Sequence, residues 1–117
     1  MDLDRPISTR IAIARLAERE IAADPGVSPT DGGGRWLTRD GDRAIAGVVA
    51  IASGGGRVDV ALHLVAHLPP RPLEQQVAVL RAELQASAQH AGLSDILGRI
   101  DVAIHDLRVP GEGEAAA

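Results

Sequence analysis

Histidine is the side chain in this sequence most suited to acid–base or metal chemistry at neutral pH, and three of the four histidines fall in two segments predicted to be strands. His63 and His67 are four residues apart, a spacing that brings two ligands together only on a helix. On a strand these residues lie roughly 13 Å apart, too far to share a metal ion. A pair across neighbouring strands, His63 or His67 with His105, could hold an ion. We predict partly exposed histidines on a sheet face and no metal or cofactor site, with a histidine-based metal or ligand sensor as an alternative.

The residues needed for catalysis do not occur in a recognisable arrangement. No serine has a G-x-S-x-G context, there is no cysteine, and all twelve basic residues are arginine, which excludes a lysine nucleophile. The glycine-rich stretches at 32–34 and 54–56 lack the residues of a P-loop or a dinucleotide fingerprint. Asp40-Gly41-Asp42 fits a turn better than a calcium loop. We therefore predict that the chain is not an enzyme.

Length and composition narrow the class of protein further. The 117 residues suit one domain, and the net charge of −4 disfavours binding to a phosphate backbone. Trp36 is the only aromatic residue, so a stacking platform for bases is excluded. Trp36 either caps the edge of the core or anchors a partner. The absence of cysteine, of a long apolar run and of a basic N-terminus predicts a cytoplasmic protein.

Hydrophobic periodicity predicts two helices and four strands. The first helix covers 7–23, with Asp4 or Ser8 as its cap, and a loop follows at 28–34. Strands are predicted at 35–39, 43–52, 58–68 and 99–107, the first two joined by a turn at Asp40-Gly41. The second helix starts near Pro72, ends at Gly92 and carries an apolar stripe: Leu73, Val77, Leu80, Leu84, Ala88 and Ala91.

This pattern predicts an α+β fold in the order α-β-β-β-α-β. Two helices would cover one face of a small mixed or antiparallel sheet, giving a two-layer sandwich in a single domain over 1–108. Residues 109–117 are expected to form a disordered Pro/Gly/Glu/Ala tail. The uncovered sheet face is predicted to be a surface for self-association or for a partner, with Trp36 as a further candidate contact. That face would carry Ala61, His63, Val65, His67, Ala103, His105 and Leu107.

Several of these segments together resemble the alkaline-shock-protein family of Gram-positive bacteria, the small Gls-type envelope stress response proteins. A helix closes in Ala-Ala-Asp-Pro-Gly-Val at 22–27, and Arg-Trp-Leu-Thr at 35–38 and Ala-Gly-Val-Val at 46–49 follow a glycine-rich segment. The strand at 58–68, a helix starting in Pro-Leu-Glu and the segment Arg-Ile-Asp-Val-Ala-Ile-His-Asp-Leu at 99–107 complete the pattern. The sequence departs from it at 92–98, where the joint before the last strand is longer.

The resemblance implies a non-enzymatic protein of cell-envelope homeostasis. Members of that family look like cytoplasmic proteins that self-associate as homo-oligomers and reach the membrane through a partner with its own anchor. The family offers no agreed catalytic residues to carry over. A small nucleic-acid-binding α+β module remains a further alternative, although the negative charge and the lack of a GXXG clamp disfavour it.

Overall fold

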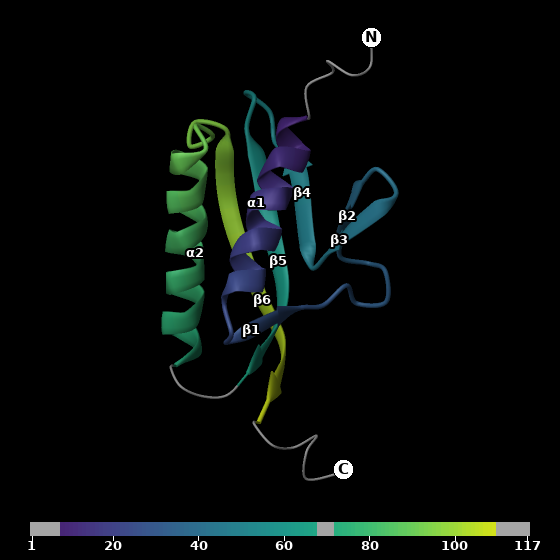
Figure 1. The fold of residues 1–117 in the computed structure, drawn as a ribbon, viewed down its shortest axis with the longest axis vertical. Helices are drawn as coiled ribbons and strands as arrows, with labels where there is room; N and C mark the ends of the chain where they lie inside the picture. The colour runs from purple at the N-terminus through teal and green to yellow at the C-terminus, as the bar shows by residue number, and fades with distance from the viewer. Residues whose placement is uncertain (1–7, 68–71, 110–117) are drawn as a thin grey trace.

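The computed structural model describes residues 8–67 and 72–109 of the chain. Within these residues the elements follow in the order α1 (Thr9–Ala23), β1 (Val27–Pro29), β2 (Leu37–Asp40), β3 (Arg43–Ala46), β4 (Val48–Ala52), β5 (Val58–His67), α2 (Leu73–His90) and β6 (Leu97–Arg108). Both helices lie on the same face of the main sheet, which confirms the predicted two-layer α+β fold (Figure 1). The predicted cap Asp4 and the predicted tail beyond Val109 lie outside the described residues.

The main sheet is built around β5, which pairs with each of its other strands. Along one edge β5 pairs in parallel with β6. Along the other edge it pairs antiparallel with two short strands placed end to end, β4 opposite Val58–Leu62 and β1 opposite Leu64–Ala66. The strands β2 and β3 form a separate antiparallel hairpin beside β4 (Figure 1). The sheet is therefore mixed, one of the two types that the sequence predicted.

The first helix begins and ends where the local sequence stops it. The Ser8 hydroxyl accepts a hydrogen bond from the Ile11 amide at 3.2 Å, so Ser8 is the cap that the sequence offered. Pro25 disfavours helical geometry in the residue before it, and the helix ends at Ala23. The buried Asp24 carboxylate then accepts hydrogen bonds from the Gly26 amide and from the Gln76 side chain of α2. This joins the start of β1 to the start of α2.

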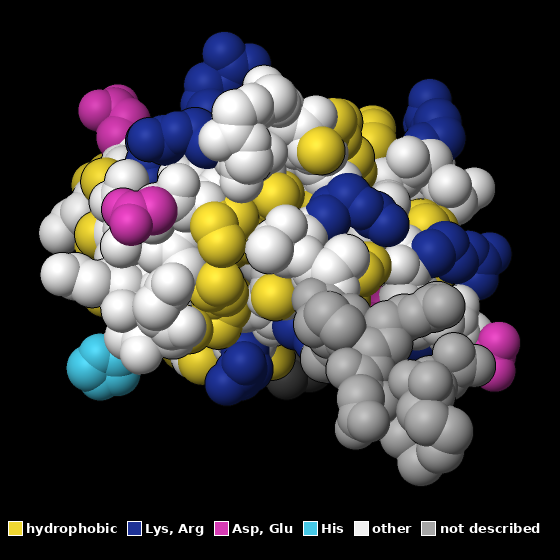
Figure 2. Space-filling model, turned by 90° about the horizontal axis from the view of Figure 1, so that it is seen from above, with side chains coloured by type: hydrophobic (Ala, Val, Ile, Leu, Met, Phe, Trp, Pro, Cys, Tyr) yellow, Lys and Arg dark blue, Asp and Glu magenta, His cyan; other side chains and the backbone are white. Residues whose placement is uncertain are grey.

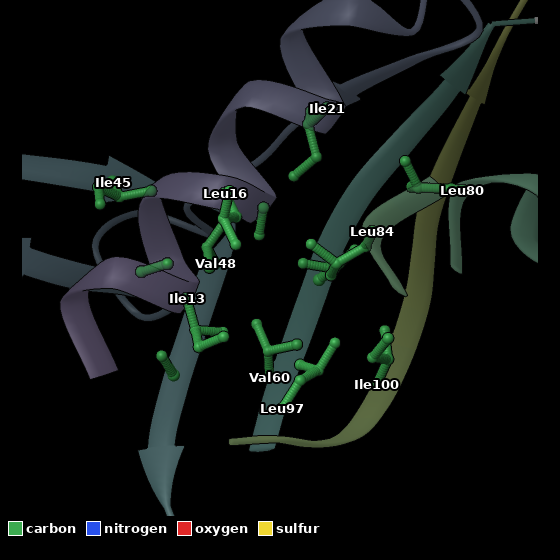
Figure 3. Close-up of a cluster of buried hydrophobic side chains, with 14 of the residues drawn as sticks. Ile13, Leu16, Ile21, Ile45, Val48, Val60, Leu80, Leu84, Leu97 and Ile100 are labelled. Atoms are coloured by element: carbon green, nitrogen blue, oxygen red, sulfur yellow. The ribbon is translucent and has the colours of Figure 1, made fainter. Parts of the chain in front are cut away.

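The core lies between the helices and one face of the sheet. α2 contributes Leu80, Leu84 and Ala88 from the predicted stripe, whereas Ala91 is exposed. Figure 3 shows Leu80 and Leu84 beside residues from α1 and from the strands. Leu93 and Ile96, in the joint between α2 and β6, also pack against this cluster. The core residues drawn from the other elements include Ile13, Leu16, Ile21, Ile45, Val48, Val60, Leu97 and Ile100.

Two local predictions need correction. The strand expected at 43–52 is broken at Gly47, which has φ +75° and separates β3 from β4. The loop expected at 28–34 begins with the end of β1, because residues 27–29 find backbone partners on β5. Both differences come from tertiary pairing with β5, which local composition does not specify.

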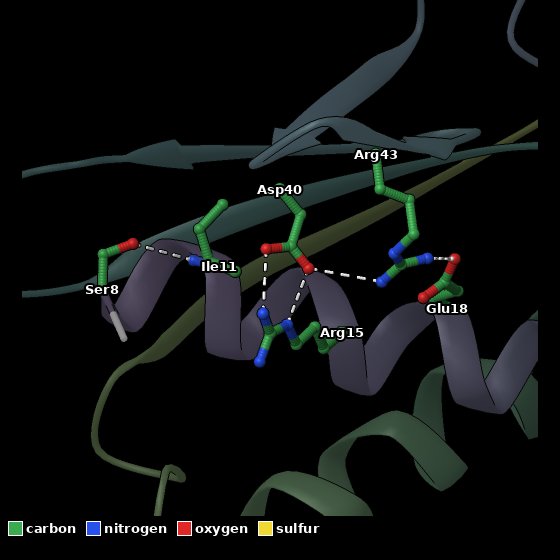
Figure 4. A network of polar contacts seen from close by, with 6 residues as sticks. All are labelled: Ser8, Ile11, Arg15, Glu18, Asp40 and Arg43. Carbon is green, nitrogen blue, oxygen red and sulfur yellow. Dashed lines mark hydrogen bonds and ion pairs between the residues drawn. The ribbon is translucent and has the colours of Figure 1, made fainter. Parts of the chain in front are cut away.

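Charged side chains fasten the β2–β3 hairpin to α1 (Figure 4). Arg15 makes two hydrogen bonds to Asp40, at 2.7 and 2.9 Å, and Arg43 bridges Asp40 and Glu18 at 3.3 and 2.6 Å. The Arg15 guanidinium holds the pKa of Asp40 below its usual value, with a further contribution from Arg43. The hairpin, and with it the segment that carries Trp36, is thus held against the rest of the fold.

Candidate functional site

The face of the sheet turned away from the helices brings two of the predicted histidines together. His63 lies on β5, where the alternation of buried and half-buried residues places it opposite the core. On β6, Ile104 pairs with Leu64 and Asp106 pairs with Val65, so His105 is an extra residue in a β-bulge. His105 lies beside His63, on the same face of the sheet. The Nδ1 atom of His63 lies 2.8 Å from the Nε2 atom of His105.

Trp36 reaches this face from the glycine-rich loop before β2. Its amide donates a hydrogen bond to the Asp31 carbonyl at 2.8 Å, and its carbonyl accepts one from the Gly47 amide at 2.8 Å. The backbone of Gly32, at φ +59°, packs directly on the indole, so that a Cβ atom at this position would collide with the ring. The loop is therefore shaped around Trp36 and is not a plain linker.

Gly47 connects the indole to the sheet. It is buried, and a Cβ atom at this position would lie 2.7 Å from the His63 carbonyl oxygen and 2.8 Å from Cβ of Pro29. The Gly47 amide is the one that binds the Trp36 carbonyl, and its own carbonyl accepts from the His63 amide at 2.7 Å. Only glycine combines this positive φ with such close approach.

The three rings form one stacked group, which we call the Trp–His cluster: Trp36, His63 and His105. The indole centroid lies 4.5 Å from the His63 ring and 4.0 Å from the His105 ring, with interplanar angles of 3° and 17°. The two imidazole centroids are 5.1 Å apart. This separation is far less than the two stacking distances combined, so both imidazoles lie on the same face of the indole. One imidazole donates an N–H hydrogen bond to the other across the 2.8 Å contact, and the tautomer decides which ring is the donor.

The surroundings of His63 favour the neutral form of its ring. Burial, and then the neighbouring charge of His105, lower the pKa of His63 below its ordinary value. The guanidinium carbon of Arg35 lies 5.2 Å from the indole centroid, within the range of a cation–π contact. The cluster therefore holds an imidazole that is ready to donate or accept a hydrogen bond at neutral pH.

His67 belongs to a different contact. Its Nε2 atom lies 2.6 Å from the hydroxyl oxygen of Ser28, across the pairing of β5 with β1. His67 is half-buried there, as a sheet-face histidine was predicted to be. His63 and His67 do not come together, in agreement with the strand geometry expected for that spacing.

Two predicted surface residues are placed differently from the expectation. Val65 was expected near the middle of the exposed face, but it is only 7% exposed, between Ser28 of β1 and Asp106 of β6. Leu107 is 45% exposed, but it pairs with Ala66. It therefore lies on the helix side of the sheet, opposite to the face that carries His105. The bulge at His105 causes this change, because one extra residue reverses the alternation of faces that follows it.

Sequence reasoning missed two apolar residues on the open face. Val49 pairs with Ala61, and Ile51 pairs with Asp59. Ile51 is 58% exposed, and Val49 is half-buried. Their alternation with the buried Val48 and Ala50 was a usable signal, since it places them on the face away from the core.

The chemistry available to this face is recognition through rings and apolar side chains. In the ranges 8–67 and 72–109 no group of three or more His, Cys, Asp or Glu residues is arranged to hold a metal ion. No helix among the described residues is long and apolar enough to cross a membrane.

Arginines gather at another part of the molecule, the end that carries the start of α1 and the β4–β5 turn. Figure 2 views this end and shows Arg side chains in separate groups, divided by apolar and neutral atoms. Arg10 and Arg57 line a hollow of about 450 Å³ there. Arg57 also donates a hydrogen bond to the Leu97 carbonyl at 3.5 Å. Among the described residues that this view shows, the Arg groups do not join into the continuous basic track that a nucleic-acid backbone requires.

The chain was compared with family models, with curated proteins and with solved structures. No protein-family model, no curated protein and no solved structure matches the chain.

Proposed function

We propose that this chain is a non-enzymatic adaptor or structural protein that acts through self-association and through docking to a membrane-anchored partner in the envelope stress response. The contact surface is the open sheet face. One observation carries the proposal: a sheet face that neither helix covers exposes Ile51 by 58% and also carries the ordered Trp–His cluster. Exposed apolar surface on a face that also holds an ordered tryptophan is typical of a binding surface.

The open face has the composition of a protein interface. Its middle carries Val49 with the small residues Ala61 and Ala103, and Ile51 lies toward the margin opposite Asp59, so the face is moderately apolar. Charges lie at one margin. There the Asp59 carboxylate accepts a hydrogen bond from the Arg99 backbone amide, and the Arg99 side chain donates one to Asp101. An apolar centre with a polar rim is the usual arrangement of an interface.

A second copy of this chain is the occupant that the charges favour. The rim carries both signs, Arg35 and Arg99 on one hand and Asp59 and Asp101 on the other. In a two-fold symmetric dimer the same patch meets itself, so a rim of both signs can pair with its own copy. A rim of one sign would repel it.

The envelope role and the membrane-anchored partner rest on the family resemblance of the sequence. That resemblance lies in the helix-then-Pro-Gly-Val junction at 25–27 and in the order of elements that follows. It stands as a hypothesis beside the surface argument and is tested separately from it.

The proposal is tested by placing a charge on the open face. Ile51→Glu is the substitution of choice, because Val65 is buried and a charge there would test folding instead. Sedimentation velocity should show assemblies larger than a monomer for the parent chain and smaller ones for Ile51→Glu, with the circular dichroism spectrum preserved. The matched control Ala82→Glu adds the same charge on the exposed side of α2 and should assemble like the parent. A parent chain that is monomeric at every concentration, or an Ile51→Glu variant that assembles normally, would contradict self-association.

The partner is tested in intact cells with a photo-crosslinking residue at position 51 and, as control, at position 82. The expected result is a crosslink to a protein with its own membrane-spanning segment, formed from position 51 only. Equal crosslinking from both positions would contradict docking through the open face.

A further inference from the structure

The His63–His105 pair presents two imidazole nitrogens to each other from neighbouring strands, Nδ1 and Nε2 at 2.8 Å. We infer that His63 and His105 form a binding site for one transition-metal ion of the class that imidazole prefers, such as Zn²⁺ or Ni²⁺. The site does not depend on the proposed adaptor function. The site consists of the two histidines that the fold brings together. When the ion binds, its bonds to the two nitrogens replace the hydrogen bond between them.

The ion requires a change both in distance and in ring orientation. Imidazole nitrogens bind Zn²⁺ at about 2.0–2.1 Å, so two of them at a tetrahedral angle lie roughly 3.3 Å apart. The pair must therefore open by about half an ångström from its 2.8 Å contact, and each ring must turn within its own plane by roughly 35° so that its lone pair meets the ion. His105 is exposed and sits in a bulge, so its side chain can move by this amount while β5 keeps His63 in place.

The indole of Trp36 orders both rings in advance. Because Trp36 stacks on one face of both imidazoles, it limits their rotation and keeps the two facing nitrogens close to a common plane. The plane of the rings is where a metal ion must lie to meet their lone pairs. Pre-ordered ligands lose less conformational freedom when the ion binds. The ion should therefore bind this pair more tightly than it would bind two surface histidines without such support.

The protons balance without an added reagent. In the free pair one of the two facing nitrogens carries a proton, and this N–H group donates a hydrogen bond to the other facing nitrogen. When the ion binds, that proton moves through solvent to the far nitrogen of the same ring, so both facing nitrogens offer lone pairs and both rings stay neutral. At acid pH an added proton competes with the ion, so binding weakens as the pH falls.

Charged groups surround the pair on each neighbouring element. From the loop before β2, Arg35 lies over the indole. From β5, Asp59 binds the Arg99 amide and His67 binds Ser28. From β6, the carboxylates of Asp101 and Asp106 bind Arg99 and the Leu107 amide. The described residues supply no third ligand in this geometry, so water completes the coordination and binding is reversible.

Trp36 is a built-in reporter for the test, since it is the only tryptophan of the chain. The full chain, without an affinity tag, is titrated with Ni²⁺, a paramagnetic ion that quenches a nearby indole. We expect saturable quenching at one ion per chain, reversed by Zn²⁺. Calorimetry with Zn²⁺ should give the same stoichiometry, and affinity should fall as the buffer is made more acid. Sedimentation at the same concentrations reports association separately, so loss of metal binding and loss of self-association remain distinguishable.

Two variants locate the site. His63→Gln and His105→Gln should each weaken Zn²⁺ binding in calorimetry by roughly tenfold or more, with circular dichroism reporting that the fold is kept. His90→Gln on α2 and His67→Gln should bind as the parent does. Quenching that stays linear in Ni²⁺ concentration would overturn the inference. So would unchanged Zn²⁺ affinity in the double variant His63→Gln/His105→Gln.

Discussion

The two faces of the main sheet are built in different ways. The face beneath the helices is filled by side chains from regularly spaced positions, such as Leu80 and Leu84 of α2 over Val60 of β5. The ordered part of the open face, the Trp–His cluster, is built from three separate segments, which are the loop before β2, β5 and a bulge in β6. It joins residues 36, 63 and 105.

This difference shows where stability and recognition reside in the molecule. Aliphatic packing on the helix side is shared by many side chains of one continuous cluster, so truncation of one side chain leaves a cavity in that cluster. The open face depends on single features, namely a glycine at 47, a bulge at 105 and one indole. A change on the first face should cost folding free energy, whereas a change on the second should alter a local arrangement.

The largest expected effect is truncation on the helix side. Leu84→Ala should lower the free energy of unfolding by about 2–5 kcal/mol, because Leu84 is fully buried and leaves a cavity. The matched change on the open face, Ile51→Ala, should shift it by about 0.5 kcal/mol or less. Urea unfolding followed by circular dichroism measures both. Equal losses would mean that the two faces contribute alike to folding.

A second test concerns the glycine that joins Trp36 to the sheet. Gly33 and Gly47 have nearly the same backbone angle, φ +74° and +75°, but only Gly47 has atoms within 4 Å of the point that a Cβ atom would occupy. Gly33→Ala should cost about 1–2 kcal/mol for the left-handed conformation alone. Gly47→Ala should cost roughly 1–3 kcal/mol more, from contact with the His63 carbonyl and Pro29. It should also shift the emission of Trp36. Identical unfolding midpoints for the two variants would remove Gly47 from its role in positioning the cluster.

The helix side could be predicted from sequence because local signals define it. The α1 cap at Ser8 and the α2 stripe through Leu80 and Leu84 follow from residue type and a 3.6-residue period. A hairpin turn was expected at Asp40-Gly41 from turn chemistry, and the structure places it one residue later, at Gly41-Asp42. Each of these needs only neighbours within a few residues.

The open face could be predicted only in part, because its details depend on pairing between distant segments. Alternation correctly placed His63 away from the core. The bulge at His105, which reverses the faces after it and leaves Leu107 beside Ala66, has no local signature. The stacking of Trp36 on both histidines depends on where Gly47 meets β5, and no spacing in the sequence reports that contact.

The smallest expected effect is the pH dependence that the Trp–His cluster gives to folding. The pKa of His63 is lowered in the folded chain, while in the unfolded chain it has its ordinary value of 6.5. Above about pH 6.5 both states are neutral at this ring, and its contribution to stability is complete. As the pH falls below about 6.5 the unfolded chain takes up the proton first, so the free energy of unfolding decreases until the folded ring is protonated as well.

Urea midpoints measured at a series of pH values should therefore fall less steeply in His63→Gln than in the parent, whatever the loss of stacking does to absolute stability. The Ile51→Ala variant, which changes the open face without removing an ionisable group, should keep the parental slope. Equal slopes in His63→Gln and the parent would show that the ring binds protons alike in both states, and the open face would then contribute no pH dependence through His63.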